Sequence, residues 1–374
     1  MLSTGRNYAN RYYYYNYYNI VRVASNVELH KLRIEILDSL FKCEYIPEDL
    51  IDVFVYILPY KSMLRKYWTK TDNTLETGLH IKALCDEKAL VFRQRVLNRW
   101  TLVVIKNLGS DRTEVYLSDS LIKYARLPVR HIYRIDDILN SILYSKFVQK
   151  GWILLHSAFV HSPCGNFLIS AHGETGKTFT TLELGRKGNF LILADDITIA
   201  NNSCYAYGIP PLYLDIYSKR PTTFQEKLRC KLYTFLSSIV RLTNYIPLWK
   251  TDLRTLLPMK TYPRELIIKA NSPVKIDYIF ILERGKNQLM AIEAYESFRK
   301  MLLLNELEFS YFYQRNYPIL MYSYFYDNDF DIVKTKERAR AILSSLCKCV
   351  RESYIVRAIS PSEYANMIYS VLVQ

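Results

Sequence analysis

Hydrophobic residues recur at helical spacing in two segments of the chain, Leu29–Phe41 and Tyr133–Lys150. Three or four residues separate the apolar positions, so each segment predicts a helix with one buried stripe. Between them, short apolar runs at 101–107 and 114–117 predict strands. The first part of the chain is therefore expected to mix helix and strand.

The middle of the chain has a different pattern, in which short apolar runs alternate with turn residues. This pattern predicts strands joined by tight connections, with one helix among them. In chain order we expect a strand at Trp152–Val160, a turn at Ser162–Gly165, a strand at Asn166–Ala171, a helix from Lys177 to about Arg186, and strands at Phe190–Ala194 and Ile197–Ala200. A glycine-containing loop precedes the helix, and an acidic pair separates the last two strands.

The length of 374 residues suggests two domains, each able to bury its own core. Residues 1–19 are polar and rich in tyrosine, and we expect a flexible arm or an edge strand there. Residues 20–132 are expected to form a smaller mixed α/β domain, and residues 133–374 a second domain, with the boundary near the helix at Tyr133–Lys150. The predicted fold class is α/β (α+β).

The net charge of +14 indicates the kind of partner to expect, because such an excess of positive charge favours polyanions. Much of it lies in one stretch: residues 219–269 hold eleven Lys or Arg against three acids, a net of +8. The apolar stretch Leu50–Tyr60 contains Asp52 and is too short to span a bilayer, and the first residues lack the layout of a signal peptide. We therefore expect a cytoplasmic protein without a membrane partner.

The seven cysteines are scattered along the chain, and only Cys347 and Cys349 are close together. No histidine lies near that pair, so the spacing does not predict a zinc site. Free thiols and no structural metal are the expectation.

The segment Ala171–Thr178 nearly matches the pattern G-x-x-x-x-G-K-[ST] of a phosphate-binding loop. In that pattern exposed N–H groups at a helix N-terminus surround the phosphates of ATP or GTP. Lys177 is expected to reach the β- and γ-phosphates and Thr178 to hold Mg²⁺. Ala171 in place of the first glycine and the charge of Glu174 depart from the pattern. The residues expected to hold the nucleotide are Gly173, Glu174, Thr175, Gly176, Lys177 and Thr178.

Asp195 and Asp196 follow an apolar run, one helix and one strand after the loop. One carboxylate is expected to bind Mg²⁺, with Asp196 assigned beside Thr178, and the other to accept a proton from an attacking hydroxyl. The sequence does not say which aspartate is the base. Alone, such a pair would be interpreted as a solvated turn, so its meaning depends on the loop upstream.

The stretch from His156 to Ala200 resembles the core of the HPr kinase family, which shares a fold with ATP-dependent phosphoenolpyruvate carboxykinase. The resemblance rests on motifs in a fixed order: His156, Gly165, the phosphate-binding loop, Leu182-Glu183-Leu184, Gly188 and Asp195-Asp196. It implies a P-loop kinase domain with a mixed sheet, ATP and Mg²⁺ as cofactors, catalysis by the acidic pair and Lys177, and a position for His156 near the reacting hydroxyl. His156 is equally consistent with a buried strand histidine. The family's later glycine- and arginine-rich signature is absent.

In this family the acceptor is a hydroxyl, and the family includes archaeal kinases that act on a ribose 2′-hydroxyl of tRNA. The basic stretch 219–269 mixes cations with aromatic residues, as proteins that hold RNA do. RNA, and tRNA in particular, is therefore the expected substrate. The residues expected to contact it are Lys227, Arg229, Lys231, Arg241, Lys250 and Arg254, with Lys61, Arg65 and Lys66 from the N-terminal domain. A kinase acting on a protein serine or a small molecule, and a nucleotide-binding module without catalysis, remain alternatives.

Overall fold

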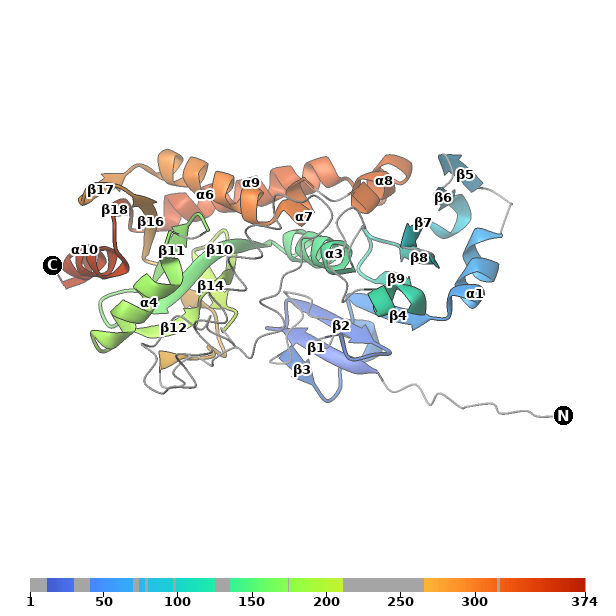
Figure 1. Ribbon diagram of the computed structural model, residues 1–374, viewed down its shortest axis with the longest axis horizontal. Coiled ribbons are helices and arrows are strands. Elements are labelled where there is room, and N and C mark those ends of the chain that lie inside the picture. The colour runs from blue at the N-terminus through green and yellow to red at the C-terminus, as the bar shows by residue number, and fades with distance from the viewer. Residues whose placement is uncertain are drawn as a thin grey trace. The chain divides into compact units, whose positions relative to one another are not determined.

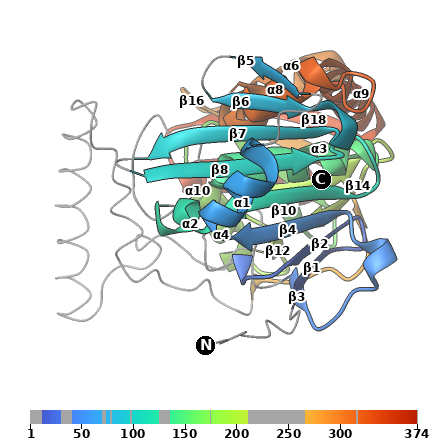
Figure 2. The same cartoon turned by 90° about the vertical axis from the view of Figure 1, so that its right-hand side faces the viewer.

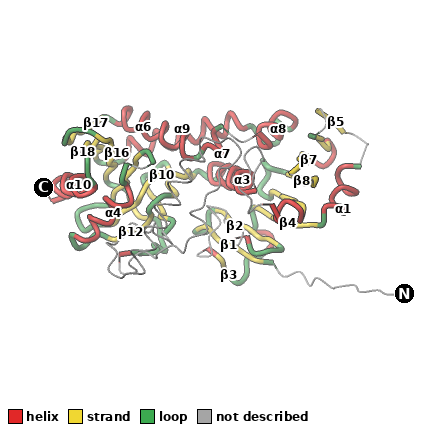
Figure 3. Tube along the Cα trace, in the orientation of Figure 1, coloured by secondary structure: helices red, strands yellow, loops and turns green. Residues whose placement is uncertain are grey.

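The computed structural model of the chain describes residues 12–29, 41–69, 74–77, 80–96, 99–124, 135–173, 175–210, 266–314 and 317–373 (Figures 1 and 3). The chain forms two compact units of mixed α/β structure. The first unit comprises residues 1–146 and 314–335, and the second comprises residues 147–313 and 336–374. Each unit contains one large mixed sheet.

The sheet of the first unit has the strand order β3-β1-β2-β4-β9-β8-β7-β6-β5 among the described residues. Its strands are β1 Tyr13–Tyr17, β2 Val21–Ser25, β3 Lys42–Cys43, β4 Val53–Leu58, β5 Thr74–Thr77, β6 Ile81–Leu84, β7 Ala89–Val96, β8 Arg99–Lys106 and β9 Thr113–Ser118. Strand β4 runs parallel to β2 and β9, and the other pairs are antiparallel.

In the first sheet, burial alternates along β9 but not along every strand, since all four residues of β6 and Thr101–Ile105 of β8 are buried. In β9, Val115 and Leu117 are buried while Glu114 and Tyr116 are half-buried, so one face of the sheet lies in the core. Helix α1 (Tyr60–Met63) and the π-turn Leu64–Trp68 cover part of the other face (Figure 2). There Met63 and Tyr67 pack on Val91 and Val104. Helices α2 (Asp119–Tyr124) and α3 (Ile135–Gln149) follow β9 in the chain.

A late segment of the chain belongs to this first unit through hydrogen bonds. Helix α8 (Tyr317–Phe325) contributes Tyr322, whose hydroxyl accepts from the Leu108 amide (3.1 Å). Tyr326 donates to the Ala89 carbonyl (2.9 Å), and Asp329 accepts from the Gly109 amide (3.0 Å). These bonds satisfy buried backbone groups, which explains why residues 314–335 group with the first unit.

The sheet of the second unit has the order β15-β14-β13-β10-β11-β16-β18-β17, and β12 also pairs with β10. Its strands are β10 Trp152–His161, β11 Phe167–Ala171, β12 Leu191–Ala194, β13 Ile197–Asn201, β14 Tyr205–Gly208, β15 Val274–Lys275, β16 Tyr278–Arg284, β17 Gln288–Ile292 and β18 Glu352–Ala358. Strands β11, β16 and β18 are parallel, so their carboxyl ends share one edge of the sheet. Every residue of β11 is buried.

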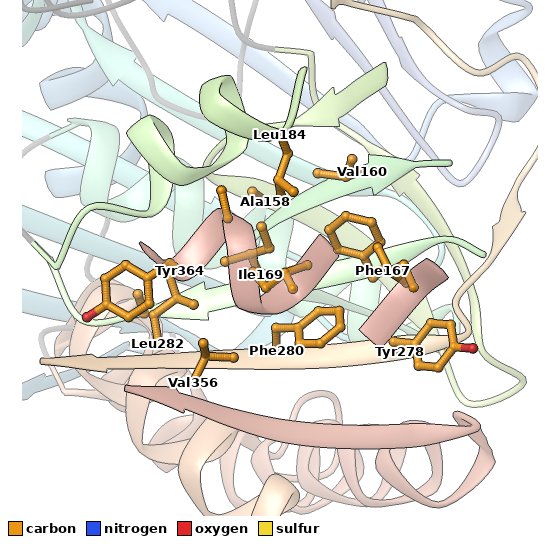
Figure 4. Packing of buried hydrophobic residues seen from close by; sticks show 14 of the residues in the cluster. Ala158, Val160, Phe167, Ile169, Leu184, Tyr278, Phe280, Leu282, Val356 and Tyr364 are labelled. Atoms are coloured by element: carbon orange, nitrogen blue, oxygen red, sulfur yellow. The ribbon is translucent and has the colours of Figure 1, made fainter. Parts of the chain in front are cut away.

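Helices α4 (Lys177–Arg186), α6 (Ala294–Glu308) and α10 (Pro361–Val373) pack against this second sheet. Helix α7 (Ser310–Tyr313) packs against α6, and α9 (Ile332–Cys349) precedes β18 in the chain. Phe167, Ile169, Phe280 and Val356 form the centre of the core with Tyr364 of α10 (Figure 4). In the part of the chain that the structure describes, no helix is long and apolar enough to cross a membrane.

The predicted elements of the middle region are confirmed. The hairpin turn 162–165 joins β10 to β11, α4 spans Lys177–Arg186, and β12 and β13 flank the acidic pair. The predicted helix Tyr133–Lys150 is observed as α3, and the strands predicted at 101–107 and 114–117 are β8 and β9. Most of the predicted helix Leu29–Phe41 lies outside the described residues.

Two expectations concerned smaller features. Within the tyrosine-rich segment 1–19, Tyr13–Tyr17 form β1, which pairs with both β2 and β3 and is therefore not an edge strand. The prediction of free thiols is wrong for Cys204 and Cys349, which form a disulfide. They lie 145 residues apart in the sequence, so their spacing gave no sign of pairing. The return of residues 314–335 to the first unit was not among the sequence predictions.

Candidate functional site

The loop after β11 leads directly into the N-terminus of α4. His172 and Gly173 are exposed, and the amide of Thr175 donates to the His172 carbonyl (3.2 Å). Gly176 has φ +113°, a left-handed conformation that glycine adopts without strain, and α4 begins at the next residue. The loop thus directs the first N–H groups of a ten-residue helix toward the carboxyl edge of the sheet, as anion-binding loops do. Glu174 lies outside the described residues.

Asp195 and Asp196 lie at a break between two strands that pair with the same neighbour. Strand β10 pairs with β12 up to Phe159↔Ala194 and with β13 from His156↔Ile197. The acidic pair therefore lies beside the middle of β10, close to His156. A glycine is required nearby, because a Cβ at Gly208 would overlap the Leu193 carbonyl.

The side chains of the loop, the acidic pair and His156 meet at this edge. Lys177 Nζ lies 2.8 Å from Asp196 Oδ1 and 3.1 Å from His156 Nε2. Thr178 donates its hydroxyl to Asp195 Oδ2 at 2.9 Å. Each aspartate thus contacts one of the two chemically important residues of the loop. The sequence placed these residues in one site, and the structure brings all five together.

The charges in this cluster determine its protonation states. Burial and the positive charge of Lys177 lower the pKa of His156 to about 3. His156 is therefore neutral near pH 7, and its Nε2 accepts a hydrogen bond from Lys177. Desolvation by itself would raise the pKa of Asp196, but 62% of this side chain is exposed, and the charge and hydrogen bond of Lys177 hold its pKa below the ordinary value. Lys177 itself is 7% exposed.

Two residues of α6 that sequence reasoning missed complete the cluster. Asn305 accepts from the His156 amide (3.0 Å) and donates to the Leu154 carbonyl (3.3 Å), which holds α6 against β10. Glu308, one turn further on, has Oε1 4.0 Å from His156 Nε2. The available signal was a polar Asn305 at helical spacing from the apolar Met301, on the buried stripe of α6.

The predicted metal site fits the residues that are present. Thr178 Oγ1 and Asp195 Oδ2 are oxygen ligands of the type that Mg²⁺ prefers, next to each other at the N-terminus of α4. It is Asp195, rather than the predicted Asp196, that lies beside Thr178. The described ranges contain no group of three or more His, Cys, Asp or Glu residues arranged to hold a metal ion by themselves.

Of the residues predicted to contact RNA, Lys61, Arg65 and Lys66 are exposed on α1 and the π-turn after it. The other six fall within 211–265, outside the described residues: Lys227, Arg229, Lys231, Arg241, Lys250 and Arg254. No family model matches the chain, and no curated protein is similar to it.

Proposed function

We propose that this protein is an ATP-dependent kinase that transfers the γ-phosphate to a hydroxyl group, with a P-loop kinase domain of the HPr kinase type in its second unit. One observation carries the proposal: Lys177 and Thr178 of the loop each contact a different carboxylate of the Asp195-Asp196 pair. Phosphoryl transfer needs a cation and N–H groups on the phosphates, an oxygen site for Mg²⁺, and a carboxylate for the attacking hydroxyl.

The chain's own residues divide these tasks. The N–H groups at the start of α4 and the Lys177 ammonium bind the phosphates, while Thr178 and Asp195 hold Mg²⁺. When bound, Mg²⁺ supplies charge that offsets the charge developing on the phosphate oxygens. Asp196 orients the acceptor hydroxyl and takes its proton. Once Lys177 turns toward phosphate, the influence that lowers the pKa of Asp196 weakens, so Asp196 becomes a better base.

His156 has a supporting task in this proposal. It is neutral and accepts a hydrogen bond from Lys177, so it positions the ammonium without competing for negative charge. Asn305 in turn fixes the backbone of His156.

The proposed acceptor is a ribose 2′-hydroxyl of RNA, with tRNA as the substrate. The net charge of +14, with +8 of it in residues 219–269, supports a polyanionic substrate, since a small metabolite needs no such excess. A protein serine or a small-molecule hydroxyl is the competing acceptor class, and the labelling experiment below separates them.

The test incubates the full chain with γ-labelled ATP, Mg²⁺ and total RNA. Label is expected in RNA that resists protease, and Lys177→Ala is expected to remove both nucleotide binding and labelling. Lys187→Ala serves as the matched control, because Lys187 follows the same helix and its ammonium contacts the exposed Asn366 and the Tyr369 ring, away from the loop. Label found only in protein or small molecules would overturn the RNA substrate. Nucleotide binding without any transfer would show a binding module rather than a kinase.

A further inference from the structure

One face of the first sheet carries an unbroken row of aromatic rings. Strand register places Tyr14, Ala24 and Phe54 side by side, and Tyr56 beside Tyr116. The ring centroids of consecutive members lie 6.2 Å (Tyr12–Phe54), 5.9 Å (Phe54–Tyr56) and 4.9 Å (Tyr56–Tyr116) apart. We call this row, with Tyr12 and Tyr14 at its end, the aromatic row.

The aromatic row differs from the core on the opposite face of the same strands. Val53, Val55, Val115 and Leu117 point to that opposite face and are at most 1% exposed. Tyr12, Tyr14, Tyr56 and Tyr116 are half-buried instead, and Tyr45, which packs edge-on against Tyr14, is 68% exposed. Within the row, Phe54 is 2% exposed and packs with Ile46 and Ile51, and Tyr116 packs beside the buried Tyr67. The rings that a ligand can reach are therefore the partly exposed tyrosines on either side of Phe54.

Cations lie beside two members of the aromatic row, Phe54 and Tyr116. The Arg112 guanidinium lies 4.0 Å from the centre of the Phe54 ring, and Lys66 Nζ lies 5.7 Å from the Tyr116 ring. Further along the same face, Arg93 lies between Trp100 (4.0 Å) and Trp68 (5.3 Å). Each contact is in the range of a cation–π interaction.

Part of this positive charge is not matched by carboxylates. Arg112 pairs with Glu48 and Glu114, and Lys106 pairs with Glu87. Across the described part of the chain, Arg65, Lys66 and Arg93 form no ion pair with an acidic side chain, and Arg65 and Lys66 are exposed. Within the described residues, the face therefore combines aromatic rings with cations that form no ion pair with a carboxylate.

From this combination we infer that the aromatic row and its flanking cations form a binding surface for single-stranded RNA. Proteins that bind single strands without sequence specificity use two components: cations that bind the phosphates and aromatic rings that contact the bases. The width also fits: the rings lie on β1, β4 and β9, with Ala24 of β2 between β1 and β4, and a four-stranded sheet accommodates about two or three bases on its surface. The choice of RNA rests on the proposed function, but binding itself requires no phosphate transfer.

The test measures binding of a fluorescein-labelled 12-nucleotide oligouridine to the full chain by anisotropy, without ATP. The double variant Arg65→Ala/Lys66→Ala is expected to weaken binding about tenfold and to reduce the slope of log Kd against log salt by about 1.4, from about 0.7 for each lost phosphate contact. Lys42→Ala is the matched control. Lys42 lies 5.0 Å from the Tyr13 ring in the same sheet, and its register with Tyr15 puts it on the opposite face.

The contribution of the rings is tested with an abasic oligomer of equal length and charge. Wild-type protein is expected to bind it about tenfold more weakly than oligouridine, and Tyr56→Leu is expected to lose most of that preference. Equal affinity for the two oligomers, or an equal effect of Lys42→Ala and the double variant, would overturn the inference. A protein that binds oligouridine in this way but labels no RNA would leave this surface in place and contradict the proposed function alone.

Discussion

In the first unit, strand β9 alternates buried with half-buried residues, whereas in the second unit every residue of β11 is buried. The first sheet can therefore present side chains from a face, as Tyr56, Tyr116 and Arg112 do. Strand β11 is covered on both faces, so beside it polar groups are accessible only where the strand ends. Lys177 and Asp196 lie at such ends.

The two regions should therefore differ in how strongly a substitution affects them. A side chain on a half-solvated face exchanges contacts with water when it is changed, so the loss is small. A buried polar group at the edge of the second sheet has few alternative hydrogen-bond partners. If its partner is removed, the unpaired donor or acceptor keeps its full desolvation cost. We therefore expect substitutions to have large effects at the edge of the second sheet and small effects on the face of the first.

The largest effect is expected from the acidic pair. Asp196→Asn should lower the rate of phosphate transfer by about 10²–10⁴-fold, the range for loss of a general base, while nucleotide binding remains. Asp195→Asn should instead raise the Mg²⁺ concentration needed for half-maximal rate, because Asp195 lies beside Thr178. Single-turnover rates over a Mg²⁺ titration measure both effects. If the two variants behave alike, the separate roles given to the aspartates are wrong.

A second effect concerns acid stability. Burial and Lys177 lower the pKa of His156 from 6.5 to about 3, so between these pH values the unfolded chain binds a proton that the folded chain does not. Stability should therefore fall as the pH drops through this window, by up to about 1.4 kcal/mol per pH unit. His156→Gln should flatten this dependence in urea denaturation measured from pH 7 to pH 4. His161→Gln, at the exposed end of β10, controls for loss of a histidine from that strand. A slope that survives in His156→Gln would assign the effect to another group.

The two regions also differ in how much the sequence revealed. In the second unit, continuous apolar runs bounded by Gly165, Gly176 and the acidic pair fixed both the elements and their order, so the candidate site could be assembled from motifs. Asn305 was missed because a helix more than a hundred residues later supplies it, and only the tertiary fold brings it to His156. The Cys204–Cys349 disulfide was missed for the same reason.

In the first unit, the sequence showed an excess of tyrosine but not its arrangement. The aromatic row joins Tyr12, Phe54 and Tyr116, which come from strands far apart in the chain. Its existence depends on the order β1-β2-β4-β9, in which β9 lies beside β4 although four strands separate them in sequence. Local spacing carries no information about such neighbours.

An intermediate effect is expected at Asn305. Asn305→Ala leaves the His156 amide and the Leu154 carbonyl without their partner, so we expect a loss of about 2 kcal/mol in the free energy of unfolding. Asn287→Ala is the matched control, since Asn287 is exposed and donates to Glu363 (3.3 Å); its effect should stay within about 0.5 kcal/mol. Urea denaturation at pH 7 measures both. Equal losses would show that Asn305 does not hold α6 to β10.

The smallest effect is expected from Arg93→Lys on the face of the first sheet. Lysine keeps the charge but cannot stack as a plane between Trp68 and Trp100, so the free energy of unfolding should fall by about 0.5–1 kcal/mol. Denaturation followed by tryptophan fluorescence reports on this position, because both neighbours of Arg93 are tryptophans. Arg95→Lys, exposed on the same strand, should change stability less than Arg93→Lys. If Arg93→Lys costs as much as Asn305→Ala, this end of the face is packed as a core. Substitutions on the face of the first sheet would then be as destabilising as those at the edge of the second, contrary to the difference proposed between the two sheets.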